Sequence, residues 1–179
     1  MMAETNLESH GSFQKLGMIE PSCNIPGSLP QWKEAVIDRA RNNFETFKNH
    51  TAVLFWSLGN ESFVGDDIAA MNAYFKEKQD GRLVHYEGVM RDRRYNDTSD
   101  MESQMYTSAE GVEEFLKKDR SKPFICCEYT HAMGNSNGAM HKYTELARKE
   151  KRYQGGFIWD YMDQAFRIKN RNGKEYFGY

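Results

Sequence analysis

The chain has 179 residues, with 24 lysines and arginines against 26 aspartates and glutamates, and a formal net charge of −2. This length supports one sizeable hydrophobic core, and the charge gives no attraction toward nucleic acid or anionic membranes. No apolar run approaches the roughly 20 residues that span a bilayer, so no nucleic-acid or membrane partner is expected. Without repeats or low-complexity linkers, residues 1–179 are predicted to form a single domain.

Short apolar or β-branched runs alternate with helical patterns along the chain. The predicted strands are Ala3–Glu8, Thr51–Leu58, Arg82–Glu87, Glu102–Thr107, Pro123–Tyr129 and Gly155–Tyr161. The predicted helices, which have apolar residues at helical spacing, are Pro30–Lys48, Asp66–Gln79, Glu110–Lys118 and Gly138–Lys151. Alternating strands and helices indicate an α/β fold with a parallel sheet.

Polar, reactive residues stand at the C-terminal ends of the predicted strands. They are Glu8-Ser9-His10, Asn60-Glu61, Glu87, Tyr106, Glu128 and Trp159-Asp160. Any one of them can be an ordinary transition from strand to loop. Together they form the pattern of a (β/α)₈ active site, where the C-terminal ends of several parallel strands supply the catalytic groups.

Two glutamates are candidates for catalytic carboxyl groups. Glu61 follows Asn60 in "FWSLGNES", residues 55–62, so one strand delivers an amide and a carboxyl group together. Glu128 follows an apolar run, where a carboxylate is costly unless it is paired, hydrogen-bonded or used in chemistry. Hydrolysis of a glycosidic bond needs two carboxyl groups, one protonated and one ionised. The structural alternative is that each glutamate caps the helix that follows it.

A third motif, "NLESHG" at residues 6–11, has the donor types of a metal site. Glu8 and His10 are two residues apart, so they share one face of a strand. With Glu61 they can form a mixed oxygen and nitrogen site for a hard divalent cation, completed by water. A salt bridge or a hydrogen-bonded histidine is the common alternative for such a pair.

Three segments resemble one known family. "SLGNES" at 57–62, "CEYTHAMGNSNG" at 127–138 and "GGFIWDYMDQ" at 155–164 are similar to the catalytic barrel of the β-galactosidases in glycoside hydrolase family 2. The resemblance implies a partial (β/α)₈ TIM barrel, containing about strands 3 to 8. It also implies a retaining enzyme that removes terminal non-reducing β-D-galactose from β-galactosides, with Glu61 as general acid/base and Glu128 as nucleophile.

The same resemblance implies a set of substrate-binding residues. Tyr106 and His131 match positions around the nucleophile, Asn60 is expected to bind the sugar 2-hydroxyl, and Trp159 is expected to lie under the galactose ring. From the residues alone, alternatives stay open. His131 is equally a loop residue with a structural hydrogen bond, and Trp159 is a candidate for the hydrophobic core.

The resemblance also implies Mg²⁺ at Glu8, His10 and Glu61. A Na⁺ site in the full-length enzyme would use ligands outside this chain. Against the family pattern the chain begins inside the third strand, so it is expected to be a fragment, about three quarters of one barrel, that is inactive in isolation. A non-catalytic truncated barrel that serves as a folding or assembly module is the alternative function.

The three cysteines, Cys23, Cys126 and Cys127, do not indicate a disulfide framework, because the adjacent pair on a strand points to opposite faces. Reduced thiols favour the cytoplasm, while the periplasm and secretion stay open because the true N-terminus is expected to be absent. The expected partner is a β-galactoside substrate, and the expected assembly is a homo-oligomer.

Overall fold

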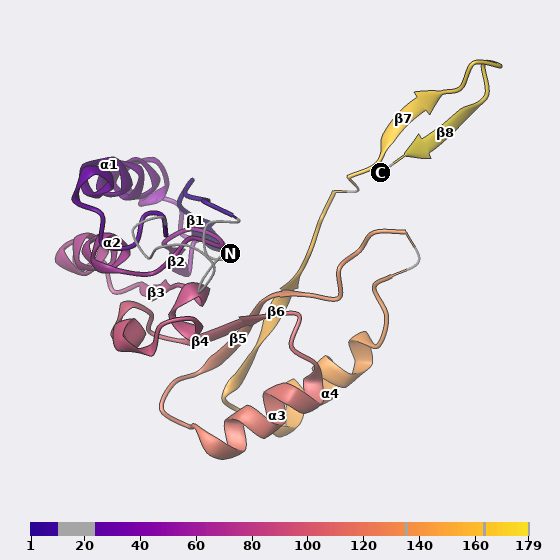
Figure 1. Cartoon of the computed structure of the whole chain (residues 1–179). Helices are drawn as coiled ribbons and strands as arrows, with labels where there is room; N and C mark the ends of the chain where they lie inside the picture. Colours follow the sequence, from indigo (N-terminus) through magenta and orange to yellow (C-terminus); the bar gives the residue numbers. More distant parts are fainter. Residues whose placement is uncertain (11–23, 135, 163, 179) are drawn as a thin grey trace.

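Parallel strands joined by helices form the frame of the structure, a computed structural model that describes residues 1–10, 24–134, 136–162 and 164–178 (Figure 1). Within the described residues these strands make two three-stranded sheets. The first contains β1 (Met2–Glu4), β2 (Phe55–Ser57) and β3 (Leu83–His85), in that order. The second contains β4 (Glu102–Met105), β5 (Phe124–Tyr129) and β6 (Tyr153–Ile158). All neighbouring pairs run parallel, which confirms the predicted α/β fold.

The helices lie close to their predicted positions. They are α1 (Pro30–Phe47), α2 (Asp66–Glu77), α3 (Ala109–Lys118) and α4 (Met140–Lys149). Proline at the start of α1 needs no backbone hydrogen-bond partner there, and the Ser108 hydroxyl caps α3 by accepting the Gly111 N–H at 3.1 Å. Two short 3₁₀ helices, η3 (Glu87–Met90) and η4 (Arg93–Thr98), occupy the connection between β3 and β4, where no helix was predicted.

The strands are shorter than predicted. In the predicted run Thr51–Leu58 only Phe55–Ser57 pairs as a strand, and β1 ends at Glu4 although the prediction extended to Glu8. Glu8 instead makes an isolated parallel bridge with Asn60. An apolar pattern marks buried residues, but it does not locate the point at which backbone pairing stops.

Each sheet packs against its own helices. In the first core, Trp56 stacks on Phe75 of α2 with ring centroids 5.4 Å apart, and Phe44 of α1 lies 5.5 Å from Trp56. In the second, Leu116 of α3 and Leu146 of α4 belong to one buried cluster with residues of β5. Cys126 and Cys127 are buried free thiols on β5, whereas Cys23 lies outside the described residues. No helix in the described part of the chain is both long and apolar enough to cross a membrane.

A chain of polar side chains runs across the strands and joins the two sheets. The Ser57 hydroxyl on β2 donates to Glu4 on β1 at 3.0 Å and lies 2.9 Å from Nδ1 of His85 on β3. Nε2 of His85 lies 2.7 Å from the Ser103 hydroxyl on β4. His85 is 1% exposed, and burial lowers its pKa to about 4. The histidine is therefore neutral at pH 7, and it connects β3 to β2 through Nδ1 and to β4 through Nε2.

The buried His85 should make folding stability depend on pH. Because the folded pKa of about 4 lies below the unfolded value of 6.5, the unfolded chain binds more protons between these values. This contribution of His85 to stability should therefore fall as pH drops from 6.5 toward 4, by up to about 3 kcal/mol. Urea unfolding midpoints at pH 5 and pH 7, at matched protein concentration, isolate it as a difference between variants, because other buried groups titrate in the same way in all of them. On going from pH 7 to pH 5, the natural chain and the control His50→Gln, which alters an exposed histidine, should lose more stability than His85→Gln does. The same change with pH in His85→Gln as in the natural chain would contradict the assignment.

Beyond β6 the chain forms an antiparallel hairpin that projects from the rest of the structure (Figure 1). It consists of β7 (Phe166–Lys169) and β8 (Glu175–Gly178), and it was not predicted. The signal was present in the sequence, because Asn172-Gly173 lies between two short runs and Gly173 adopts a positive φ of 78°. The Asn170 side chain also accepts the Lys174 N–H across the turn, at 3.0 Å.

Candidate active site

The predicted catalytic and substrate-binding residues lie at the C-terminal ends of the parallel strands. Glu61 follows β2, Tyr106 follows β4, Glu128 is the penultimate residue of β5, and Trp159 follows β6. Parallel strands bring their carboxyl ends to one edge of a sheet, so residues far apart in sequence are collected there.

The carboxyl group of Glu128 accepts a hydrogen bond from a tyrosine side chain. The Tyr106 hydroxyl donates to Oε2 of Glu128 at 2.6 Å, which fixes the carboxyl group and favours its ionised form. Partial burial nevertheless raises the pKa of Glu128, and the negative charges of Glu61 and Glu8 raise it further. Burial, together with the hydrogen bond to Glu128, raises the pKa of Tyr106 as well, so its hydroxyl remains a donor.

Glu61 sits on an unusual backbone. Its φ is 43°, in the left-handed region that non-glycine residues seldom adopt. Its carboxylate Oε2 lies 2.6 Å from Nε2 of His10, and its backbone N–H donates to Oε1 of Glu87 at 2.7 Å. The Glu61 side chain is 20% exposed, so a solute can reach it.

The candidate catalytic carboxyl group of Glu128 is affected by the charge of Glu61. The charge of Glu61 is among the causes that raise the pKa of Glu128. The helix-capping alternative is wrong for both residues, because the N-cap positions of α2 and α4 are Gly65 and Ala139. Both residues therefore stay candidates for the catalytic carboxyl groups.

The predicted metal ligands are only partly brought together. His10 and Glu61 make direct contact, whereas Glu8 bridges to Asn60 through its backbone. In the described ranges, no three His, Cys, Asp or Glu side chains are grouped so that they could hold a metal ion. Magnesium stays a prediction from the sequence.

The substrate-binding candidates border the two glutamates. The ring of His131 lies 6.1 Å from that of Tyr106, and its positive form lowers the pKa of Glu128. Trp159 is 37% exposed, so the core alternative for it is wrong. Its carbonyl accepts the N–H of Ala132, next to His131, at 2.6 Å. Asn60 is half-buried, and its backbone N–H donates to the Leu7 carbonyl at 2.9 Å.

Two further residues at the end of β3 contact the Glu61 loop and had no predicted role. Tyr86 and Glu87 are 0% and 1% exposed. Burial raises the pKa of Glu87 to about 8. Glu87 is one of the polar residues at the C-terminal ends of the predicted strands. No sequence spacing indicates that its side chain reaches the Glu61 backbone, 26 residues away.

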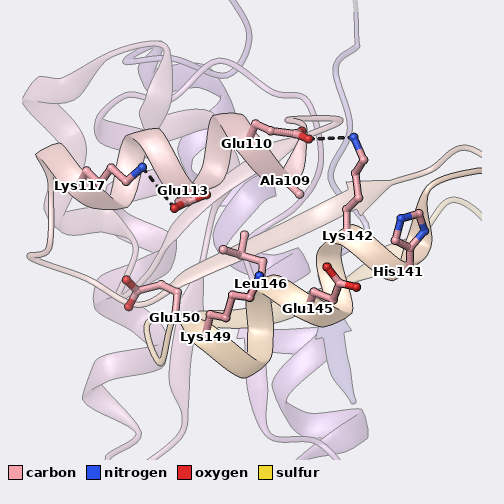
Figure 2. Close-up of a pocket in the computed structure, with 10 residues that line it drawn as sticks. All are labelled: Ala109, Glu110, Glu113, Lys117, His141, Lys142, Glu145, Leu146, Lys149 and Glu150. Atoms are coloured by element: carbon pink, nitrogen blue, oxygen red, sulfur yellow. Dashed lines mark hydrogen bonds and ion pairs between the residues drawn. The ribbon is translucent and has the colours of Figure 1, made fainter.

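A separate hollow lies between α3 and α4, away from the candidate active site (Figure 2). Its cavity volume is about 460 Å³. Its charged side chains are largely paired, as in the ion pairs of Lys142 with Glu110 at 2.8 Å and of Lys117 with Glu113 at 3.2 Å. None of the predicted site residues lines it.

Sequence comparison finds relatives over nearly the whole chain. Residues 1–179 match the family model described as "Glycosyl hydrolases family 2, TIM barrel domain". The β-galactosidase large subunit of Lactobacillus helveticus is 61% identical over 169 residues, covering 94% of this chain and 27% of that protein. The β-galactosidase of Clostridium acetobutylicum is 58% identical over 179 residues, covering 100% of this chain and 20% of that protein. The chain therefore spans about a quarter of these relatives or less.

Solved structures with a similar fold are more distant in sequence. The β-glucuronidase 2 of Bacteroides uniformis, covalently bound to cyclophellitol-6-carboxylate aziridine, superposes with a TM-score of 0.57 at 13% identity, covering 76% of this chain and 22% of that one. A family 2 member from Bacteroides cellulosilyticus gives a TM-score of 0.54 at 16% identity, covering 72% of this chain and 17% of that one. These likenesses concern the fold alone, and with the family match they confirm a partial TIM barrel.

Proposed function

Because the chain belongs to glycosyl hydrolase family 2 and matches its TIM barrel domain, we propose that it provides the catalytic barrel of a retaining β-galactosidase. The observation that carries the proposal is the pair of carboxyl groups, Glu61 and Glu128, at the ends of β2 and β5. Each is held in place by a neighbour, His10 for Glu61 and Tyr106 for Glu128. Two such groups are what glycoside hydrolysis needs.

The first step forms a glycosyl-enzyme. The Glu128 carboxylate attacks the anomeric carbon of galactose while the bond from that carbon to the leaving oxygen breaks, and Glu61 donates its proton to that oxygen. The hydrogen bond from Tyr106 keeps Glu128 oriented toward the sugar. In the second step Glu61 removes a proton from water, the water oxygen attacks the anomeric carbon, and Glu128 leaves as a carboxylate.

Galactose is the proposed sugar because of the close relatives. Proteins at 56–61% identity over most of the chain are named β-galactosidases or β-galactosidase large subunits. The solved β-glucuronidases share only 13–17% identity, which says nothing about the sugar. Exposed Trp159, beside the loop that carries His131, offers a flat apolar surface suited to a sugar ring.

A grafted enzyme tests the proposal. In it, the stretch of the Clostridium acetobutylicum β-galactosidase that matches this chain is replaced by residues 1–179. We expect this grafted enzyme to hydrolyse 4-nitrophenyl β-galactoside with retained anomeric configuration, as followed by NMR. Preference for the corresponding glucuronide, or a product of inverted configuration, would contradict the proposal. Loss of activity in Glu128→Gln, made in the same grafted enzyme, would show that the inserted residues and not a contaminant carry the activity.

The alternative function, a non-catalytic module, makes a distinct prediction for the 179-residue chain alone. In the described residues the strands that end the two parallel sheets, β1, β3, β4 and β6, each pair on one side only, and unpaired strand edges favour association. An apolar hollow of about 390 Å³ also opens at the N-terminal ends of the strands, where Leu54 and Leu83 are 62% and 46% exposed. We propose that the isolated chain self-associates and does not turn over galactosides, because a misplacement of ~1 Å can cost ~100-fold in rate.

Light scattering after size-exclusion chromatography, with a galactoside assay on the same fractions, measures both properties. The double variant Leu54→Ser with Leu83→Ser should shift the distribution of molecular masses toward the monomer. The control Glu77→Ser, which alters an exposed residue at the end of α2, should leave the distribution unchanged. An active monomer would show that this prediction is wrong.

A further inference from the structure

The backbone at Glu61 and Ser62 is hydrogen-bonded by the two residues that follow β3, Tyr86 and Glu87. Oε1 of Glu87 accepts the Glu61 N–H at 2.7 Å. The Tyr86 hydroxyl accepts the Ser62 N–H at 3.2 Å and donates to the Ser62 carbonyl. Both side chains are almost completely buried, so water does not compete for these hydrogen bonds. We call Tyr86 and Glu87 the β3 clamp.

The clamp holds a conformation that the chain would not adopt without support. A left-handed φ of 43° at Glu61 brings Cβ close to the following carbonyl oxygen, so residues other than glycine seldom adopt it. Such conformations persist where the surrounding structure over-determines them, and they are concentrated at active sites. Here the N–H groups of Glu61 and Ser62 both find partners on the clamp, which defines the direction in which the Glu61 Cα–Cβ bond points.

We propose that Glu87, assisted by Tyr86, is a positioning residue that aims the Glu61 carboxyl group at the leaving oxygen of the glycoside. This inference rests on the proposed function, because it presumes that Glu61 is the acid/base. Glu87 contacts the Glu61 backbone through its own side chain and acts on the reaction only through Glu61. His10 holds the other end of the same residue, at the carboxylate, so Glu61 is fixed at both its backbone and its side-chain terminus.

Two neighbouring residues, Gly88 and Ser99, stabilise the position of the clamp. A Cβ atom on Gly88 would lie 2.4 Å from the Tyr86 ring, so only glycine lets the chain turn past the tyrosine here. The Tyr86 N–H donates to the Ser99 hydroxyl at 3.0 Å, which ties the end of β3 to the loop before β4. The clamp is thus anchored independently of Glu61, as a positioning device has to be.

A purely structural role for Glu87 predicts a different outcome from a positioning role. Loss of structure lowers activity on every substrate alike. A misdirected acid/base slows formation of the glycosyl-enzyme mainly from glycosides with basic leaving groups, because in this step only these need the proton that Glu61 delivers. The comparison of an alkyl galactoside with 2,4-dinitrophenyl galactoside therefore separates the two roles.

The experiment measures kcat/KM for both substrates in the grafted enzyme, because kcat/KM reports formation of the glycosyl-enzyme and is not limited by the second step, in which Glu61 activates water. We expect Glu87→Leu to lower kcat/KM on the alkyl galactoside by about 100-fold and on the dinitrophenyl galactoside by less than about tenfold. Glu87→Gln keeps a side-chain oxygen that can accept the Glu61 N–H, and should stay within about threefold of the parent on both. The matched control is Glu102→Leu. It removes another buried glutamate, which lies on β4 and forms an ion pair with Arg93 at 2.7 Å. It should affect both substrates equally.

Equal losses on the two substrates in Glu87→Leu, or full activity on both, would overturn the inference. If Glu87→Leu does not fold, Tyr86→Phe takes its place, because it removes only the hydroxyl that bonds Ser62. Tyr86→Phe should show the same leaving-group preference on a smaller scale. Losses of equal size on both substrates in this variant would again overturn the inference. Glu61→Gln serves as the reference. If it lacks the leaving-group preference, the proposed function fails, whereas a preference in Glu61→Gln alone means that only the clamp inference fails.

Discussion

A 2-deoxy-2-fluoro-galactoside with a good leaving group should label the grafted enzyme on Glu128. Fluorine at carbon 2 destabilises the oxocarbenium-like transition state of both steps, and the good leaving group lets the first step outpace the second, so the covalent adduct accumulates. Peptide mapping by mass spectrometry should place the fluorogalactosyl group on the peptide that contains Glu128. A label on Glu61 would reverse the two assignments.

The matching substitution, Glu128→Gln, should lower kcat by about 10⁴-fold or more, the size of effect seen when a nucleophile is removed from other covalent enzymes. The control is Glu110→Gln, which alters an exposed glutamate on α3 that pairs with Lys142 and lies away from the candidate active site. It should retain activity within about twofold. Retention of activity in Glu128→Gln would contradict the nucleophile assignment.

Replacement of Glu61 by glutamine should separate substrates by the basicity of their leaving groups. Without a proton donor, departure of an alkyl alcohol should slow by about 10²–10⁴-fold, the usual contribution of general acid catalysis. Departure of 2,4-dinitrophenolate needs no proton, so formation of the glycosyl-enzyme from this substrate should slow little. The decrease of kcat/KM for alkyl galactosides at high pH should also disappear, because ionisation of the general acid causes this decrease.

The measurement is a pre-steady-state burst of dinitrophenolate, followed by slow turnover, because Glu61 also activates water in the second step. Azide, which needs no general base, should restore turnover by attacking the glycosyl-enzyme. Losses of equal size for both leaving groups, without a burst, would argue against an acid/base role for Glu61. Glu110→Gln again serves as the control.

The regular elements of this fold could largely be predicted from local patterns. Pro30 and the apolar spacing that follows it located α1 within one residue, and the run before Glu128 located β5 to within one residue. These elements are predictable because each has a buried face that the sequence repeats at the period of a helix or strand. The hairpin β7–β8 was missed although its Asn-Gly turn is visible. Its strands have four residues each, and three of these eight residues are charged.

By itself, the sequence determined that this is an α/β chain with carboxyl groups at the ends of its parallel strands, because those properties depend on nearest neighbours and on periodicity. Only the tertiary structure decided which of these groups meet. It paired Tyr106 with Glu128 and placed Glu87 on the backbone of Glu61, but it did not group Glu8 with His10 and Glu61. The physical reason is that hydrogen bonds form over about 3 Å between residues tens of positions apart. Which side chains come within that distance depends on strand register and loop conformation, and these are settled only when the strands pack.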